Sequence, residues 1–232
     1  MKQGKILVME GTDCSGKETQ TKLLLKRLVK DKIPCEKMSF PRYNTPTGRI
    51  IGQCYLGKES LGEGDLAWFG DANKVNPLIA SLYYASDRIA ALPDILKIIN
   101  SGKHLILDRW VESNMGHQAG KERDIKKRIK TINFIHNLEY TLLKLPKPDS
   151  VIFLYMPYKI GIELKKNRKG SADGHESNIN HLKNAEETYL QLAKKYNWIK
   201  INCALNGSIN FLRTPEDISD EVYNNIKKMF YK

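Results

Sequence analysis

The sequence predicts a three-layer α/β/α fold with a mainly parallel central sheet and a lid segment. Two observations predict it: short apolar runs alternate with stretches of helical periodicity, and a glycine-rich turn follows the first apolar run. Strands covered by helices on both faces read as short apolar runs, because neither side meets water. The expected strands are residues 5–9, 35–40, 104–107, 151–154 and 198–202.

Helical stretches separate these strands. Apolar side chains recur at helical spacing within residues 23–29, directly after the glycine-rich turn. Residues 78–99 are expected to form the next helix, interrupted near Pro93 because proline removes a backbone donor. Residues 60–77 are glycine-rich and are expected to be an irregular surface segment. The later helices are expected over residues 131–145, 178–196 and 217–230.

The size and composition of the chain suit a single domain. Its 232 residues are expected to form one unit, residues 1–232, with a lid at about residues 161–178. The hydrophobic content of 41% and the charged content of 28% are typical of a folded globular protein. No apolar run approaches the roughly 20 residues that a membrane span needs, and the first residues lack the shape of a signal peptide. We therefore expect a cytoplasmic protein with no membrane partner.

The net charge and the cysteines limit which binding partners are expected. A net charge of +12 is compatible with nucleic acid or with a phosphate-rich substrate. Much of the excess lies in runs at residues 121–130 and 165–169, where solvated helix faces are the simpler interpretation, so a nucleic-acid partner is not expected. The four cysteines form neither a CxxC pair nor a metal-ligand spacing, which favours reduced thiols over a zinc site or disulfides.

A phosphate-binding loop is predicted at residues 11–17, where GTDCSGK matches the spacing GxxxxGK between a strand and a helix. Backbone N–H groups of such a loop cradle phosphates, and the helix N-terminus adds partial positive charge. Lys17 would reach the β- and γ-phosphates. The motif assigns the expected fold to the P-loop NTPase type. The residues expected to bind ATP are Gly11, Thr12, Asp13, Cys14, Ser15, Gly16, Lys17, Glu18 and Thr19.

One position departs from the usual loop. Glu18 follows Lys17, where serine or threonine normally binds Mg²⁺. Three alternatives stay open: Thr19 substitutes, Glu18 holds the ion directly or through water, or other groups hold it. A carboxylate also suits the first turn of a helix. The expected cofactor is Mg²⁺, with ATP as co-substrate.

Separate segments of the chain resemble the thymidylate kinase family, in that family's order. They are GTDCSGKETQ at residues 11–20, SFPR at 39–42, YASDR at 84–88, LDRW at 107–110 with Ser113 close behind, and LPKPD at 145–149. They cover most of the chain, and the combination is more specific than any single motif. The resemblance implies phosphorylation of dTMP to dTDP by ATP with Mg²⁺, in dTTP biosynthesis. Because the family usually forms homodimers, a homodimer is expected.

The resemblance also implies roles for individual residues. Asp13 would hydrogen-bond the 3′-hydroxyl of dTMP, and Arg42 and Arg109 would bind its phosphate. Tyr84 would stack on the thymine ring, and Arg88 would reach an oxygen on the ring edge. The expected substrate-binding set, whose last two members would line the nucleoside pocket, is Asp13, Phe40, Arg42, Tyr84, Arg88, Arg109, His117 and Gln118.

These roles suit the chemistry of the side chains. The planar, charged fork of arginine matches phosphate oxygens, and an aromatic face stacks on a pyrimidine. Asp108 and Arg109 follow a buried strand, where parallel sheets bind their ligands. The simpler alternative for these two is a strand-end salt bridge. For Tyr84 it is core packing, and for Arg88 a surface ion pair with Asp87.

A lid is expected where KKNRKG at residues 165–170 precedes DGHE at 173–176. The family places a catalytic arginine in either the phosphate loop or the lid, and this loop has none. The resemblance therefore implies Arg168, with Lys169 as the alternative; a solvated basic turn is the simpler interpretation. His175 is expected to hydrogen-bond within the lid, since no second ligand stands at metal spacing. The expected catalytic set is Lys17, Asp108, Arg109 and Arg168, in which Asp108 organises the acceptor phosphate or a metal-bound water.

Two rival functions stay open at this point. Another nucleoside monophosphate kinase or a deoxynucleoside kinase would share the fold, although two arginines at the acceptor phosphate favour a monophosphate. A non-catalytic nucleotide-binding protein is compatible with Glu18 and with the basic charge. The first rival would differ in its acceptor, and the second would release no ADP with dTMP.

Overall fold

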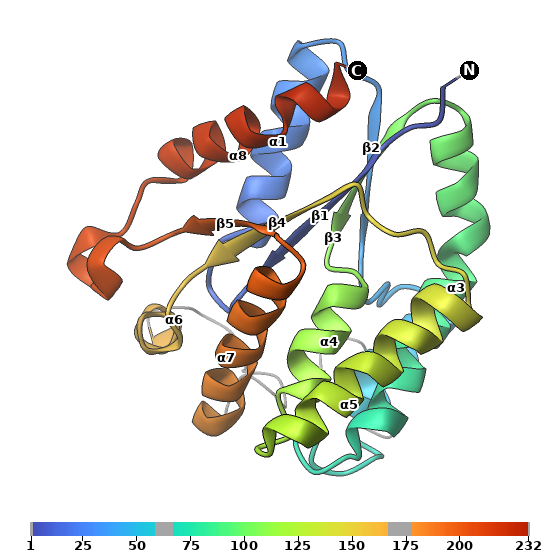
Figure 1. Ribbon diagram of the computed structural model, residues 1–232, viewed down its shortest axis with the longest axis vertical. Helices are drawn as coiled ribbons and strands as arrows, with labels where there is room; N and C mark the ends of the chain where they lie inside the picture. The colour runs from blue at the N-terminus through green and yellow to red at the C-terminus, as the bar shows by residue number, and fades with distance from the viewer. Residues whose placement is uncertain (1, 59–66, 167–177, 232) are drawn as a thin grey trace.

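The computed structural model describes residues 2–58, 67–166 and 178–231, which form a five-stranded parallel sheet between two layers of helices (Figure 1). The three-layer fold class predicted from the sequence is confirmed. The strand order is β2-β3-β1-β4-β5, so β1 is central. The strands are β1 (Ile6–Gly11), β2 (Cys35–Ser39), β3 (His104–Asp108), β4 (Ser150–Tyr155) and β5 (Ile199–Asn202).

Helices cover both faces of the sheet (Figure 1). One face is covered by α1 (Lys17–Lys30) and α8 (Pro215–Phe230). The other face is covered by α3 (Pro77–Asn100), α4 (Val111–Ala119), α5 (Ile125–His136) and α7 (Ile179–Lys195). The shorter elements are α2 (Pro46–Arg49), α6 (Tyr158–Lys166) and π-helical turns at Ile50–Tyr55 and Asn137–Leu142. Within these described ranges, every helix is too short or too polar to cross a membrane.

The central strand supplies side chains to two separate cores. Leu7 and Met9 pack on the side of α1 and α8, where Leu24 is also buried. Val8 points to the opposite face and packs with Ile95 of α3. Successive side chains of a strand alternate between the faces of the sheet, so a continuous apolar run is what a doubly covered strand requires. Each fully buried side chain of this kind stabilises the fold by roughly 1.5–3 kcal/mol.

The interruption expected near Pro93 is wrong, because α3 runs unbroken through this residue. A proline inside a helix costs about 3 kcal/mol through its missing donor and its ring. Pro93 lies on the exposed side of α3, while Ala91, Ile95 and Ile99 are buried against the sheet. Burial of this apolar face outweighs the local cost.

Two further helix predictions need correction. The helix expected over residues 131–145 begins earlier, at Ile125, because the Asp124 side chain accepts a hydrogen bond from the Lys127 N–H and caps it. It also gives way to a π-helical turn at Asn137–Leu142. Helix α4 was not predicted at all. Nearly all of its residues are buried, polar ones included, so it lacks the amphipathic pattern that identifies most helices.

The strand ends bring the sequence motifs together. In the parallel register, Met9 lies opposite Asp108 of β3, and Gly11 lies opposite Leu154 of β4. The loop that follows β1 is therefore flanked by the segments that follow β3 and β4. This edge, at the carboxyl ends of the strands, is where open α/β sheets bind ligands.

A buried carboxyl group on α4 predicts an unusual pH dependence of stability. Glu112 is 4% exposed, its Oε1 accepts a hydrogen bond of 2.6 Å from the Tyr140 hydroxyl, and burial raises its pKa to about 7. Nearby Glu10 also raises this pKa, while Arg88 lowers it. Because the folded protein holds this proton more tightly than the unfolded chain, stability falls as the pH rises from about 4.5 to about 7.

We expect Glu112→Gln to remove that loss, which is on the order of 3 kcal/mol. Thermal unfolding at pH 5 and at pH 8 measures it, and the difference in Tm between variant and wild type should shift in favour of the variant at pH 8. Other titrating groups are common to both proteins and cancel. An equal difference at the two pH values would show that Glu112 titrates normally.

Candidate active site

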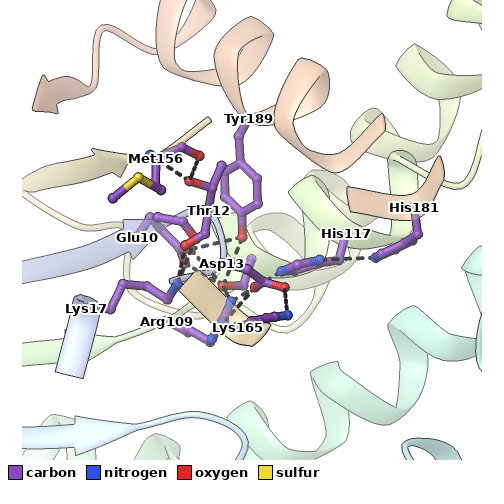
Figure 2. A network of polar contacts seen from close by, with 12 residues as sticks. Glu10, Thr12, Asp13, Lys17, Arg109, His117, Met156, Lys165, His181 and Tyr189 are labelled. Atoms are coloured by element: carbon purple, nitrogen blue, oxygen red, sulfur yellow. Dashed lines mark hydrogen bonds and ion pairs between the residues drawn. The ribbon is translucent and has the colours of Figure 1, made fainter. Parts of the chain in front are cut away.

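The phosphate loop is anchored to the neighbouring strand. The Thr12 hydroxyl donates to the Met156 carbonyl at 2.6 Å and accepts from the Met156 N–H at 2.8 Å, just past the end of β4 (Figure 2). Lys17 donates from Nζ to the carbonyls of Gly11 and Thr12, both at 2.9 Å. Burial, with nearby Arg109, lowers the pKa of Lys17 to about 8, even though Asp13 opposes the shift. Lys17 is thus held against the loop and is largely shielded from solvent.

Glycine is required in this loop for two different reasons. At Gly11 a Cβ atom would lie 2.7 Å from the Leu154 carbonyl oxygen, so the packing against β4 excludes any side chain. At Gly16 the backbone adopts φ of 79°, in the left-handed region, at the cap of α1. Cys14 also has a positive φ, 57°, without being glycine. Such backbone strain in a non-glycine residue is concentrated at functional sites.

Arg109 occupies a second strained position, directly after β3. Its φ is 66°, and its guanidinium lies 3.2 Å from the His117 ring nitrogen, 3.5 Å from the Ser113 hydroxyl and 4.0 Å from the Asp13 carboxylate. These contacts come from α4 and from the phosphate loop. The structure therefore brings Arg109 beside the loop, as the strand-end rule predicts.

Asp13 lies among cations at the centre of the site (Figure 2). Its carboxylate is 3.1 Å from Lys165 Nζ of α6 and 4.0 Å from Arg109. Burial alone would raise the pKa of Asp13, but Lys17, His117, Lys165 and Arg109 hold it well below its usual value. Asp13 is therefore ionised at neutral pH. Lys165 belongs to the basic segment expected to form the lid, and it is a described residue of that segment that contacts the loop at Asp13.

Glu10 was not predicted, yet it organises the start of α4. Its fully buried carboxylate accepts hydrogen bonds from the Trp110 N–H at 3.0 Å, the Ser113 hydroxyl at 2.7 Å and the Tyr189 hydroxyl at 3.1 Å (Figure 2). Burial raises its pKa, while the charge of Arg109 lowers it. Arg109 directly precedes Trp110 in the sequence, so the bond from the Trp110 N–H to Glu10 helps to fix the backbone at Arg109. A carboxylate within an apolar strand was the available signal.

A cavity of about 80 Å³ adjoins Arg109. Phe40 and Tyr84 form part of its wall, and Phe40 packs on Trp110 with ring centroids 5.0 Å apart. Arg88 is buried there, bound to both carboxylate oxygens of Glu139 at 2.9 and 3.0 Å, so it is not the surface partner of Asp87. Within the part of the chain that the structure describes, Arg88 Nε has no hydrogen-bond partner. Buried donors without partners are rare, and Arg88 is part of the lining of this cavity.

Other residues expected at the substrate take different positions. His117 lines the cavity, whereas Gln118 is buried behind it and accepts a hydrogen bond of 3.3 Å from the Tyr55 hydroxyl. Arg42 is outside the cavity lining, and its guanidinium binds the carboxylate and the carbonyl of Asp87 at 3.3 and 3.1 Å. Tyr43, next to Arg42, does line the cavity.

His117 is set to remain neutral. Its ring lies 3.4 Å from that of His181 on α7, and the two rings are stacked within 11°. Burial and the charges of Arg109 and His181 lower the pKa of His117 well below the usual value. A neutral ring can accept a hydrogen bond from Arg109 without repelling it. His181 was not predicted, because it stands far from any recognised motif.

A second cavity, of about 400 Å³, lies over the phosphate loop and is lined by the loop, Asp108 and Arg109. Asp108 is 3.9 Å from Lys37 Nζ, a weak form of the strand-end salt bridge considered above. Glu18 and Thr19 both line this cavity, and Glu18 also pairs with Lys22 at 2.6 Å. Mg²⁺ takes one or two carboxylates together with phosphates and water. The oxygen donors here, Asp108 above all, fit that requirement.

The remaining expected residues lie outside the described ranges: Arg168, Lys169 and His175 belong to residues 167–177. The two cavities share Asp13 and Arg109 in their linings. The site thus consists of a phosphate loop, a charged junction and an aromatic pocket. This arrangement can hold two phosphorylated ligands end to end.

Comparison with known proteins gives a consistent result. The sequence model of thymidylate kinase matches residues 9–211. A thymidylate kinase of Plasmodium falciparum is 25% identical over 228 residues, which are 98% of this chain and 92% of that protein. One from Prochlorococcus marinus is 27% identical over 229 residues, 98% of each chain. A solved structure of thymidylate kinase from Candida albicans has the same fold, with a TM-score of 0.71, 20% identity, and coverage of 97% of this chain and 92% of that one.

Proposed function

This chain belongs to the thymidylate kinase family, and from that premise we propose how its site transfers a phosphoryl group from ATP to dTMP. The protein is a kinase, and its reaction converts dTMP to dTDP. The single observation that carries the residue assignments is the junction of the two cavities at Asp13 and Arg109. Phosphoryl transfer is catalysed mainly by positioning and by charge stabilisation, so the transfer must occur where donor and acceptor phosphates meet.

The donor nucleotide occupies the larger cavity. Loop N–H groups and the start of α1 bind the phosphates, and Lys17 turns from the carbonyls of Gly11 and Thr12 to the β- and γ-phosphates. Mg²⁺, when bound, neutralises charge on these phosphates. Asp108 would hold it, with a hydroxyl from Thr19, while Glu18, which lines the same cavity, is paired with Lys22.

The acceptor nucleotide occupies the aromatic cavity. Tyr84 stacks on the thymine ring, and Arg88 Nε, which is without a partner in the described chain, donates to an oxygen on the ring edge. Asp13 accepts a hydrogen bond from the 3′-hydroxyl, and Arg109 binds the phosphate. Phe40 and His117 complete the walls.

The roles of two arginines have less structural support. Arg42 would assist Arg109 only by sharing its guanidinium with Asp87. Arg168 would supply positive charge to the transferring group from the lid. It lies outside the described residues, and the support for it is the arginine-free phosphate loop and the approach of Lys165 to Asp13.

We also propose that the protein is a homodimer in the cytoplasm. Support for the dimer comes from exposed apolar side chains on two neighbouring helices, Ile79, Leu82 and Leu96 of α3 and Ile125 and Ile129 of α5. Apolar patches of this kind mark protein–protein contacts. Sedimentation analysis measures the oligomeric state directly.

An acceptor panel tests the assignment of the aromatic cavity. With ATP and Mg²⁺, we expect ADP release to be fastest with dTMP, slower with dUMP, UMP and CMP, and negligible with thymidine, which offers no phosphate to Arg109. A coupled assay of ADP measures all five acceptors. Thymidine turnover equal to that of dTMP would remove Arg109 from acceptor binding. No ADP release with dTMP would contradict the function itself.

A further inference from the structure

A third cavity, of about 400 Å³, lies at the opposite edge of the sheet from the phosphate loop. It is bounded by the beginnings of β4 and β5 and by side chains from α4, α5 and the π-helical turn after α5. Its lining shares no described residue with the two nucleotide cavities. Cavities of this size hold small organic ligands.

A buried carboxyl group in the lining lacks a partner. Glu112 Oε1 accepts the Tyr140 hydroxyl at 2.6 Å, but Oε2 has no hydrogen-bond partner among the described residues. A carboxyl group accepts up to about four hydrogen bonds, and a buried one left unsatisfied is unfavourable. Glu112 lines neither nucleotide cavity, and no step of the phosphoryl transfer uses it. Oε2 can therefore accept a hydrogen bond from an N–H or O–H group of a bound ligand.

The shape and the chemistry of the other walls specify a flat ligand. The rings of His136 and Tyr196 are parallel within 2° at 6.3 Å, and Tyr196 stacks on Trp198 at 6.4 Å and 19°. All three residues line the cavity, as does Tyr140. Aromatic faces at a binding site suit planar rings and contribute roughly 1–3 kcal/mol for a stacked base. A saturated or strongly charged ligand would gain little from them.

We propose that this cavity binds a planar nitrogen heterocycle of nucleobase size, whose ring-edge N–H groups donate to Glu112. A carboxylate matches two adjacent N–H donors in a bidentate pair. Among common heterocycles, guanine presents such an edge, with its ring N–H beside its amino group. Hypoxanthine presents the ring N–H alone, and adenine places a ring acceptor beside its amino group. The site therefore ranks guanosine above inosine, and inosine above adenosine.

Isothermal titration of the full chain at pH 8, where Glu112 with its pKa of about 7 is mostly ionised, tests this proposal. ADP and dTMP are present at saturation so that both nucleotide cavities are filled. We expect saturable one-to-one binding of guanosine, about tenfold weaker binding of inosine, and still weaker binding of adenosine. Glu112→Leu, which removes both acceptor oxygens, should abolish guanosine binding. Glu112→Gln, which keeps one acceptor and the shape, should weaken it about tenfold and reduce the guanosine preference.

Phosphorylation of dTMP by both variants, together with their Tm, shows whether they are folded. If Glu112→Leu does not fold, Glu112→Gln alone decides through the ratio of guanosine to inosine affinity. The proposal is overturned if none of the three nucleosides binds, or if folded variants bind guanosine as tightly and as selectively as wild type. The proposed function fails separately, through the acceptor panel, which does not depend on this cavity.

Discussion

Replacing Lys17 with alanine is expected to lower kcat for dTMP phosphorylation by about 10³-fold or more. The ammonium group is the one loop side chain that can follow the charge of the β- and γ-phosphates, and it lines the donor cavity. A 10³-fold loss corresponds to about 4 kcal/mol of transition-state stabilisation. Such a loss is typical when one preorganised donor is removed from a site that excludes water.

Steady-state kinetics with ATP, Mg²⁺ and dTMP measure this effect. Lys22→Ala is the matched control, because Lys22 is on the same helix but exposed, and its ion pair within the described residues is with Glu18 across one turn. Lys17 also donates to two loop carbonyls, so Lys17→Met, which retains the apolar stem, separates a chemical effect from a folding defect. If Lys17→Met kept normal turnover in a folded protein, the loop would have no catalytic role.

The three central strands, β3, β1 and β4, were predictable because burial on both faces requires a run of apolar residues. Ile6, Val8 and Leu105 to Leu107 are apolar and buried, as a strand covered on both faces requires. Helix α4 left no such signature, since Glu112, Ser113, Asn114 and Gln118 are polar yet buried. The hydrogen-bond partners that these side chains do have are distant in sequence, for example Glu10 for Ser113. Hydrophobic periodicity indicates which face of a helix or strand is buried, but it carries no information about contacts between residues far apart in the sequence.

The same reasoning explains which site residues were found. Arg109 follows β3 directly, so the strand-end rule locates it, and Lys17 ends the GxxxxGK motif between β1 and α1. Lys165 and His181 enter the site from α6 and α7, at positions that only the packing of these helices determines. Arg42 was expected at the acceptor phosphate, but nothing in the sequence indicates that Asp87 would bind its guanidinium. Competition between partners is a property of the folded structure.

Arg109 is therefore expected to matter far more than Arg42 for the use of dTMP. We expect Arg109→Ala to lower kcat/KM for dTMP by about 10³-fold, because a charged fork at the junction of the cavities binds the phosphate directly. Arg42→Ala should cost about tenfold, since its guanidinium is already bound to Asp87 and contributes to the phosphate only in part. Kinetics at varied dTMP with saturating ATP compare the two.

Arg109→Lys tests whether the planar guanidinium is needed in addition to the positive charge. It keeps the positive charge beside Asp13 and loses the planar pair of donors, so we expect a loss between those of alanine and wild type. Arg123→Ala, at an exposed position, is the control for removal of an arginine as such. Equal losses for Arg42→Ala and Arg109→Ala would mean that Arg42 leaves Asp87 when dTMP binds. The acceptor phosphate would then be held by two arginines of equal weight, and the position of Arg42 described above would belong only to the protein without its substrate.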